Sequence, residues 1–361
     1  MYVSSLSLNN FRNYEKQYIE FSSGTNVFCG HNAQGKTNIL EAIYMFCRGK
    51  SIRAKHENEI IRFGKEFYRL DMSFFSNERI NKGIISADTK GRKAISINNI
   101  PITKFSMLMS YFNAVFFNPE DLGLIKGAPS QRRRFMDSSL SQLYPGYLSS
   151  LINYNKSLMQ KNSLLRQLRK CNKHSDAALS AWNEILSDDG AKIMRYRQEF
   201  ADKMNVIAAQ IQKDISGECL KTVYSPGVSC SADKEEYYVF LEEHSYREIE
   251  LGSSKYGIQR DDIDIFINDK EARLYSSQGQ QRTAALALKI AQGDFISDVK
   301  NEYPVLLLDD IMSELDINRR RYLWERIERG QVIITCTDTD SLEMPGESKI
   351  FYVENGKIKG G

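Results

Sequence analysis

Three kinds of hydrophobic pattern divide the chain into segments. The first is an alternation with a period of two, which recurs at residues 70–74, 80–84 and 95–97, with turn residues such as Asn77 and Gly91 between the runs. Alternation of this kind is typical of strands that bury one face. These three runs therefore predict an antiparallel meander.

The second pattern is helical and begins near residue 129. Apolar residues recur three or four positions apart as far as residue 212, with a polar break at 172–175. This spacing places them on one face of a helix. We expect two long helical pieces that form a hairpin or small bundle, with Gly190 as a candidate interruption of the second.

The third pattern consists of short apolar runs in the rest of the chain. Residues 25–29, 304–310 and 331–336 are typical of buried strands. Residues 350–358 contain Asn355-Gly356 between two short runs, which is a strong hairpin signal. Helical spacing occurs at residues 38–46, 283–296 and 318–329.

The mixture of buried strands and helices predicts an α/β fold, in which a head with mixed sheets carries an inserted compact α-helical lobe. The chain has 361 residues, of which 42% are hydrophobic, and this is enough for two domains. We place the lobe at residues 126–219 and the discontinuous head at 1–125 and 220–361. No apolar stretch approaches membrane length, so we expect a soluble, cytoplasmic protein with no membrane partner.

The sequence at residues 30–37 matches G-x-x-x-x-G-K-[ST] at every fixed position. It lies between a predicted strand and a predicted helix, the context in which backbone N–H groups and a helix N-terminus converge on one phosphate. We call this segment the phosphate cradle; its residues are Gly30, His31, Asn32, Ala33, Gln34, Gly35, Lys36 and Thr37. We expect Lys36 to reach the β and γ phosphates of ATP and Thr37 to bind Mg²⁺.

Two carboxylates end the predicted strand at residues 304–310. Asp309 is placed to hold Mg²⁺ together with Thr37, and Asp310 to orient or activate the attacking water. Zinc is not indicated, because the six cysteines never form a Cys-x-x-Cys pair and the four histidines show no ligand spacing.

A second anion site is indicated by Ser277-Gln278-Gly279-Gln280, which precedes a predicted helix. A serine hydroxyl and free N–H groups at a helix start favour a phosphate. Since one nucleotide already has its cradle, this site makes sense if it faces the nucleotide of another subunit. Taken alone, this short motif favours the simpler interpretation of Ser277 as a helix N-cap.

The charge is uneven along the chain. Residues 126–173 contain ten Lys and Arg against one acid, so this block carries +9 and the remainder −6 of the net +3. Such a block indicates a polyanionic partner or a solvated helix face. Arginines in the first turn of a helix oppose its dipole, so an anion is expected nearby, either DNA phosphate, an acidic partner or an internal carboxylate such as Asp137 or Glu120. The candidate DNA contacts are Arg132, Arg133, Arg134, Lys161, Arg166, Arg169 and Lys170.

These motifs together resemble the ATP-binding-cassette ATPases of the SMC and Rad50 type, and more closely the RecF family of bacterial DNA replication and repair proteins. The resemblance extends from end to end. Besides the cradle and the acidic strand end, it rests on residues 8–14, 117–122, 132–137, 260–262, 277–283 and 313–316.

The resemblance implies an ATP-dependent homodimer in which each nucleotide lies between one chain's cradle and Ser277, Gly279 and Gln280 of the other. Such a dimer binds double-stranded DNA near single-strand gaps and junctions. It hydrolyses ATP weakly, with stimulation by DNA, and works with RecR and RecO so that RecA is loaded. Arg12 and Asn13 would lie near the nucleotide, and residues 118–121 would occupy the place of the cassette's Q-loop.

Two departures from related sequences concern the site. Gly257-Ile258-Gln259 stands where the family usually has Gly-Pro-His, so the role of that histidine is lost or moved. Residues 335–338 contain no switch histidine, which argues against a transporter subunit and leaves Thr337 or Asp338 to sense the γ phosphate. A transporter's ATP subunit and a P-loop small-molecule kinase are the alternatives; the kinase would have no use for Ser277-Gln278-Gly279.

Overall fold

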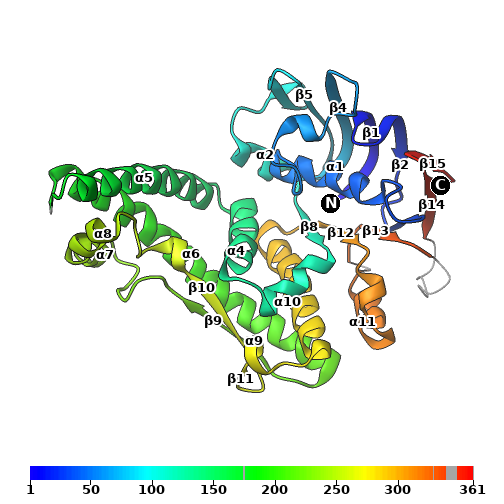
Figure 1. The fold of residues 1–361 in the computed structure, drawn as a ribbon. Coiled ribbons are helices and arrows are strands. Elements are labelled where there is room, and N and C mark those ends of the chain that lie inside the picture. Colours follow the sequence, from blue (N-terminus) through cyan, green and yellow to red (C-terminus); the bar gives the residue numbers. More distant parts are fainter. Residues whose placement is uncertain (174, 328, 339–347, 361) are drawn as a thin grey trace. The chain divides into compact units, whose positions relative to one another are not determined.

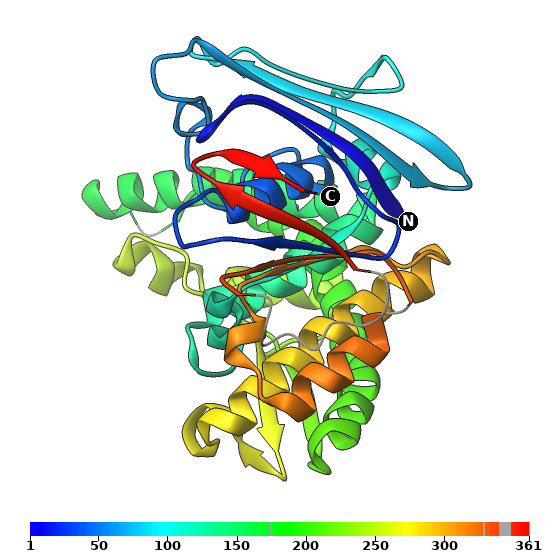
Figure 2. The same cartoon turned by 90° about the vertical axis from the view of Figure 1, so that its right-hand side faces the viewer.

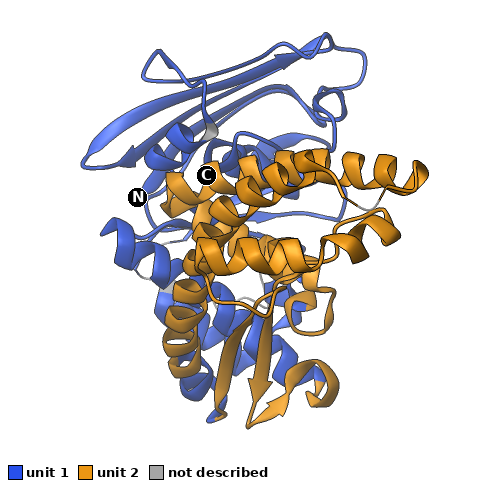
Figure 3. Cartoon of the chain, turned by 90° about the vertical axis from the view of Figure 1, so that its left-hand side faces the viewer, with its two compact units in different colours: residues 1–122, 211–217, 278–361 blue, residues 123–210, 218–277 orange. Residues whose placement is uncertain are grey.

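The computed structural model of the chain describes residues 1–173, 175–327, 329–338 and 348–360. Its contacts divide it into two compact units (Figure 3). Unit 1 comprises residues 1–122, 211–217 and 278–361, and unit 2 comprises residues 123–210 and 218–277. The predicted boundary at residue 220 is therefore not the boundary of the compact units. Residues 218–277 join unit 2, because their strands pair with one another and pack on the helix that begins at Pro129.

Unit 1 contains a six-stranded antiparallel sheet in the order β2-β1-β4-β5-β6-β7. The predicted meander is confirmed as its β4, β5 and β6, which pair in sequence. The strands are β1 (Tyr2–Phe11), β2 (Tyr14–Glu20), β4 (Phe67–Ser76), β5 (Arg79–Asp88), β6 (Lys93–Ile97) and β7 (Ile100–Pro101).

The second sheet of unit 1 has the order β15-β14-β3-β13-β12-β8 and is parallel except for its last hairpin. Its strands are β3 (Thr25–Cys29), β8 (Ala114–Phe117), β12 (Val305–Asp309), β13 (Val332–Cys336), β14 (Lys349–Glu354) and β15 (Lys357–Lys359). The central strands are buried along their length, as expected for a parallel sheet covered on both faces. The predicted strands and the C-terminal hairpin are confirmed.

Helix α1 (Lys36–Arg48) lies between the two sheets of unit 1 (Figure 2). Its Ile39, Ile43 and Phe46 belong to a continuous apolar core with residues of both sheets. Helix α10 (Gln278–Lys300) packs on β8, and α11 (Ile317–Ile327) lies beside it below the parallel sheet (Figure 1). Unit 1 also contains α2 (Phe105–Tyr111).

Unit 2 combines helices with a three-stranded antiparallel sheet, β11-β10-β9. Its elements are α3 (Gly123–Lys126), α4 (Pro129–Leu143), α5 (Pro145–Lys170), most of α6 (Ala177–Ser216), β9 (Leu220–Ser225), α7 (Lys234–Glu243), α8 (Ser245–Leu251), β10 (Asp262–Ile267), β11 (Lys270–Glu271) and α9 (Ala272–Tyr275). Among the described residues, none of the helices is both long and apolar enough to cross a bilayer.

Gly190 does not interrupt the second helical piece, because α6 is continuous through it. A Cβ atom at this position would lie 2.3 Å from the Tyr237 ring. The glycine therefore admits a buried tyrosine against the helix, and close packing rather than a helix break explains it.

Candidate functional site

The phosphate cradle connects β3 to α1, as the motif requires. Gly35 has φ +113° at the N-cap of α1, and the Tyr14 hydroxyl donates to its carbonyl at 3.1 Å. The Lys36 ammonium donates to the carbonyl oxygens of Gly30 and of His31, the latter at 2.9 Å. The lysine thus lies across the loop, at the start of a helix whose dipole favours an anion.

Asn13 lies against the cradle, whereas Arg12 is bound elsewhere. The Asn13 amide donates to the Gln34 carbonyl at 2.7 Å and accepts from Asn38 at 2.8 Å. Arg12 forms a two-point ion pair with Glu41, whose carboxylate is fully buried on α1, at 2.9 and 2.7 Å. Arg12 therefore neutralises a buried acid behind the loop, and Asn13 is the residue of the pair that touches the cradle itself.

The end of β12 brings a carboxylate to the cradle. Asp309 Oδ1 accepts hydrogen bonds from the Thr37 and Thr335 hydroxyls, each at 2.8 Å. A hydroxyl next to a carboxylate is a donor set that suits Mg²⁺, which takes its remaining ligands from phosphates and water. Among the described residues, no group of three or more His, Cys, Asp or Glu side chains is arranged for a metal. The site therefore fits a metal that arrives with a phosphate ligand.

Asp310 follows in a left-handed conformation, with φ +52°. Its N–H donates to the Thr335 hydroxyl at 3.0 Å, so the residue turns away from the strand while its backbone stays fixed. Burial raises the pKa of its carboxyl group; nearby Lys36 lowers it, and Asp309 and Glu314 raise it. A carboxylate with a raised pKa is the better proton acceptor.

The second anion motif lies at the start of α10. Ser277 is exposed and precedes Gln278, the first residue of the helix. Arg319 of α11 donates to the Gly279 carbonyl at 2.9 Å and to the Thr283 hydroxyl at 2.7 Å, and it forms an ion pair with Asp316. The start of α10 is thus tied to the loop that follows the acidic strand end.

Residues 118–121, in the predicted place of the Q-loop, form a compact turn after β8. Asn118 and Asp121 exchange side-chain to backbone hydrogen bonds at 3.0 and 3.2 Å. The Asp121 carboxylate also pairs with the buried ammonium of Lys289 on α10 at 3.4 Å. The segment is therefore connected to the helix that carries the second anion motif.

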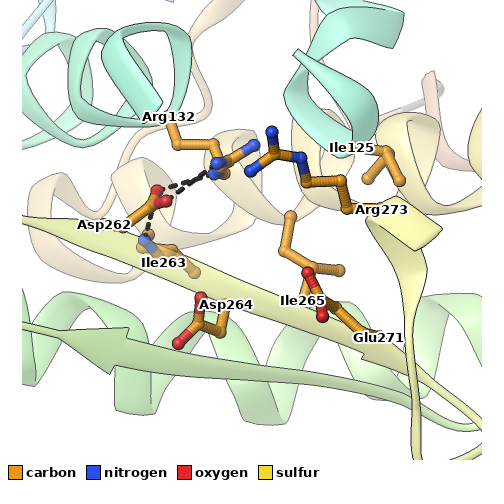
Figure 4. Close-up of a pocket in the computed structure, with 8 residues that line it drawn as sticks. All are labelled: Ile125, Arg132, Asp262, Ile263, Asp264, Ile265, Glu271 and Arg273. Carbon is orange, nitrogen blue, oxygen red and sulfur yellow. Dashed lines mark hydrogen bonds and ion pairs between the residues drawn. The ribbon is translucent and has the colours of Figure 1, made fainter. Parts of the chain in front are cut away.

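Arg132 is a structural residue of unit 2. Its guanidinium forms a two-point ion pair with Asp262 at 2.6 and 2.8 Å (Figure 4). The guanidinium also donates to the carbonyls of Leu124 and Gly127, and the side chain is buried. Figure 4 also shows Asp264 and Glu271 on the same small pocket wall. The anion expected near the first turn of α4 is thus an internal carboxylate, although it is Asp262 and not Asp137 or Glu120.

Lys161 is likewise buried, since none of its side chain is exposed and its ammonium lies 2.6 Å from Glu248. Neither Arg132 nor Lys161 is accessible to a large ligand, so the expectation that they contact DNA does not fit this structure. Arg133 is half-buried and donates to the Asp261 carbonyl at 2.8 Å. Of the seven candidate DNA contacts, Arg134, Arg166, Arg169 and Lys170 are exposed.

Gln259, which stands in place of the family's histidine, has a structural role. Its Oε1 accepts from the buried Tyr154 hydroxyl at 2.8 Å, and its amide donates to the Tyr256 carbonyl at 2.7 Å. The adjoining Asp261 is fully buried and pairs with the buried Arg197 at 2.6 Å. These residues form the polar interior of unit 2.

Sequence reasoning missed Thr335, which contacts both acids of the strand end. No local sequence pattern could have found it, because Thr335 becomes the register partner of Asp309 only through the pairing of the parallel strands β12 and β13. Thr337 and Asp338, which the sequence suggests as sensors of the γ phosphate, follow directly after β13 and are exposed.

Known proteins are similar in sequence to almost the whole chain. The family model described as RecF/RecN/SMC N terminal domain matches residues 2–359. DNA replication and repair protein RecF of Clostridium botulinum (strain ATCC 19397 / Type A) is 40% identical over 366 residues, which cover 99% of this chain and all of that protein. RecF of Ruminiclostridium cellulolyticum is also 40% identical, with 99% of each chain covered.

Solved structures give the same result. A structure of the recombination mediator protein RecF-ATPrS in the RecFOR pathway has a TM-score of 0.92 and 32% identity, and covers 99% of this chain and 98% of that one. The Smc head domain of Pyrococcus furiosus, at 17% identity and a TM-score of 0.58, shares the fold. The fold and the cradle thus define a P-loop ATPase head of the SMC type. Within that class, the chain belongs to the RecF family of DNA replication and repair proteins.

Proposed function

We propose that this protein is an ATP-dependent DNA-binding switch of recombinational repair and replication-fork maintenance. The observation that carries the proposal is the 2.8 Å hydrogen bond between Thr37 of the cradle and Asp309 at the strand end. It joins the phosphate-binding loop to the carboxylate that a nucleotide-bound Mg²⁺ requires. RecF structures described as ATP-bound, at 32% identity, support ATP as the nucleotide.

Each residue of the cradle has a defined task in this proposal. Lys36 exchanges its contacts with loop carbonyls for the β and γ phosphates, and backbone N–H groups of residues 30–35 hold the remaining phosphate oxygens. Thr37 and Asp309 hold Mg²⁺, which neutralises charge on the phosphates when bound. Asp310 accepts a proton from the attacking water, a role its raised pKa favours.

ATP acts by joining two copies of the chain. Ser277, Gly279 and Gln280 at the start of α10 bind the γ phosphate of the partner's nucleotide through a hydroxyl and the backbone N–H groups of the helix start. Because Ser277 is exposed, it is accessible to a second subunit. Hydrolysis removes the phosphate that both subunits bind, and the dimer dissociates. The slow rate of hydrolysis therefore sets the lifetime of the dimer.

The ligand of the dimer is double-stranded DNA next to a single-strand gap. Arg134, Arg166, Arg169 and Lys170 are exposed basic side chains of unit 2 that suit phosphate contacts. RecR and RecO are the protein partners and RecA is the protein loaded, in the cytoplasm. The RecFOR pathway to which the solved RecF structures are assigned supports this choice.

The test is the solution mass of the purified protein by light scattering without nucleotide, with ADP, and with ATP and Mg²⁺. We expect a monomer that becomes a dimer with ATP, and a Lys36→Ala variant that stays monomeric and no longer gains DNA affinity from ATP. A wild-type protein that binds ATP and stays monomeric, with and without DNA, would contradict the switch and favour a small-molecule kinase. Full DNA affinity in Lys36→Ala would separate DNA binding from ATP.

A further inference from the structure

Two tight turns from opposite ends of the chain meet at one residue of the phosphate cradle. The turn between β1 and β2 contributes Asn13, and the turn between β14 and β15 contributes Asn355 and Gly356. The residue they meet is Gln34, which occupies the position before the second glycine of the cradle. All of these residues belong to unit 1.

Gln34 accepts three hydrogen bonds from these turns. Its carbonyl oxygen accepts from the Asn13 amide at 2.7 Å and from the Gly356 N–H at 3.3 Å. Its side-chain Oε1 accepts from the Asn355 N–H at 2.5 Å. Both the backbone and the side chain of this one cradle residue are therefore held from outside the loop.

The carbonyl contacts also orient a phosphate-binding group. The Gln34 carbonyl and the Gly35 N–H belong to the same peptide unit, which is planar and trans, so the two groups point in opposite directions. Donors on the carbonyl therefore fix the direction of the Gly35 N–H. That N–H points away from the donors on the carbonyl, and it is one of the cradle N–H groups that we expect to bind phosphate.

The C-terminal turn belongs to a hairpin that contacts two other strands. Strand β14 pairs with β3, the strand that leads into the cradle, with Tyr352 opposite Cys29. The Ile358 N–H of β15 donates to the Gln17 side chain of β2 at 3.2 Å. The hairpin is thus anchored on both sides, by β3 and by β2.

Gly356 leaves no room for a side chain. Its φ is +69°, and a Cβ atom there would lie 2.7 Å from the Asn13 carbonyl oxygen. A side chain at this position would push the two turns apart at the point where both bind Gln34. The turn is therefore sensitive to a single methyl group.

We propose that the C-terminal turn Asn355-Gly356 is a positioning element of the nucleotide site, which sets the Gln34–Gly35 peptide for phosphate binding. It acts through the cradle and does not itself touch the nucleotide. The proposal rests on the ATP-binding function proposed above. It adds that the nucleotide affinity of the chain depends on residues more than three hundred positions after the cradle.

The test compares Gly356→Ala with Gly64→Ala. Gly64 has a similar backbone conformation, with φ +76°, but no atom lies within 4 Å of a Cβ there. Both variants carry the cost of a left-handed alanine, so both should lower the melting temperature in the absence of nucleotide. Only Gly356→Ala also displaces the turn from Gln34.

The measurements are the Kd of a fluorescent ATP analogue and the rise in melting temperature on adding ATP and Mg²⁺. We expect Gly356→Ala to bind about tenfold more weakly, the loss that a few hydrogen bonds would produce, and Gly64→Ala to bind as wild type does. Equal affinity in both variants would overturn the proposal. If wild type itself fails to bind ATP, the proposed function fails instead.

A second variant guards against a Gly356→Ala protein that does not fold. Gln34→Met removes the side-chain acceptor of the Asn355 N–H and leaves the backbone of the cradle in place. We expect an affinity about threefold weaker than that of wild type, since one solvent-exposed hydrogen bond is lost. An unchanged Kd in this variant would also contradict the role of the turn.

Discussion

The Thr335 hydroxyl donates a hydrogen bond to Asp309 and accepts one from the N–H of Asp310. One side chain on β13 therefore fixes both acids at the end of β12, and Thr37 approaches the same Asp309 oxygen from the cradle. Thr335 is almost fully buried, so these contacts are not exchanged for water. Strand β13 thus helps to position the two acids that we propose bind Mg²⁺ and activate water.

Replacing this hydroxyl tests its role. Thr335→Val keeps the shape of the side chain but removes the hydrogen bonds of the hydroxyl to Asp309 and from the Asp310 N–H, which keeps the backbone carbonyl of residue 335 as an acceptor at 3.3 Å. The loss of these two hydrogen bonds costs roughly 1–3 kcal/mol in folding free energy. We expect hydrolysis to fall at least tenfold while ATP still binds. Thr335→Ser, which keeps the hydroxyl, should restore most of the rate; a serine variant as slow as the valine variant would assign the effect to packing.

Asp310→Asn should slow hydrolysis strongly without destabilising the fold. We expect the rate of ATP hydrolysis to fall by at least about 10²-fold, because a positioned general base contributes that much. Light scattering should then show an ATP-bound dimer that persists. Normal turnover would remove Asp310 from catalysis.

The fold should tolerate the same change, for two reasons. Asparagine accepts the left-handed backbone at position 310. The pKa of the Asp310 carboxyl group is higher in the folded protein than in the unfolded chain. Protonation of this group therefore stabilises the folded protein at low pH, and this stabilisation is lost as the pH rises from the unfolded-state pKa through the folded-state pKa. Near neutral pH the ionised group contributes no stability through this pKa shift, and the melting temperature of the variant should match or exceed that of wild type.

The same raised pKa gives wild type a pH profile. A base works only when it is deprotonated, so ATP hydrolysis should rise as pH increases through the folded pKa of Asp310, which lies above that of an ordinary aspartate. Comparing kcat against pH for wild type and Asp310→Asn would show this limb in the first protein and not in the second.

Ser277→Arg should block dimerisation and leave nucleotide binding intact. The arginine places bulk and a long side chain at the exposed start of α10, where the partner's phosphate is proposed to bind. Light scattering with ATP should show a monomer, while the Kd for a fluorescent ATP analogue stays near that of wild type. A dimer of normal stability would mean that this helix start does not face the partner subunit.

The exposed basic residues of unit 2 should control the salt dependence of DNA binding. Arg134→Ala and Lys170→Ala should each weaken binding to duplex DNA of any sequence and reduce the slope of log K against log salt by about one, as expected for the loss of one phosphate contact. Lys90→Ala, at an exposed turn of unit 1, is the matched control and should leave the slope unchanged. Slopes equal to wild type in both unit 2 variants would place the DNA surface elsewhere.

Lys161 should behave differently from its exposed neighbours in sequence. Its ammonium and the Glu248 carboxylate are both fully buried, so Lys161→Met leaves a buried charge without its partner. A cost of about 3–5 kcal/mol is expected for breaking such a pair. Chemical denaturation should show this loss, while the folded variant should keep the wild-type salt slope in DNA binding.

The sequence predicts those parts of the site that are local in the chain. The strand, loop and helix around the cradle were predicted because a contiguous motif and apolar spacing specify them, and the hairpin because Asn355-Gly356 favours one turn type. Contacts between distant segments were not predictable in this way. The sequence alone suggests that Arg132 lies on the surface, because its ion-pair partner Asp262 comes 130 positions later in the chain.

The division into units was mispredicted for a related reason. Residues 218–277 contain strands, and the sequence pattern assigns strands to the head. Their place in unit 2 follows from pairing and packing that no local period reports, namely β9 with β10 and β10 with α4.

The strand order of the parallel sheet has a consequence for synthesis of the protein. Strand β3 lies between β13 and β14, and Thr25 is paired with Val332, 307 residues later. On the ribosome the cradle therefore emerges long before either neighbour of its strand exists, and such distant pairings form slowly. Unit 2 has all of its residues available first. The strand that leads into the cradle therefore gains its two neighbours only after β13 and β14 have been synthesised, so we expect the nucleotide site to form late in folding.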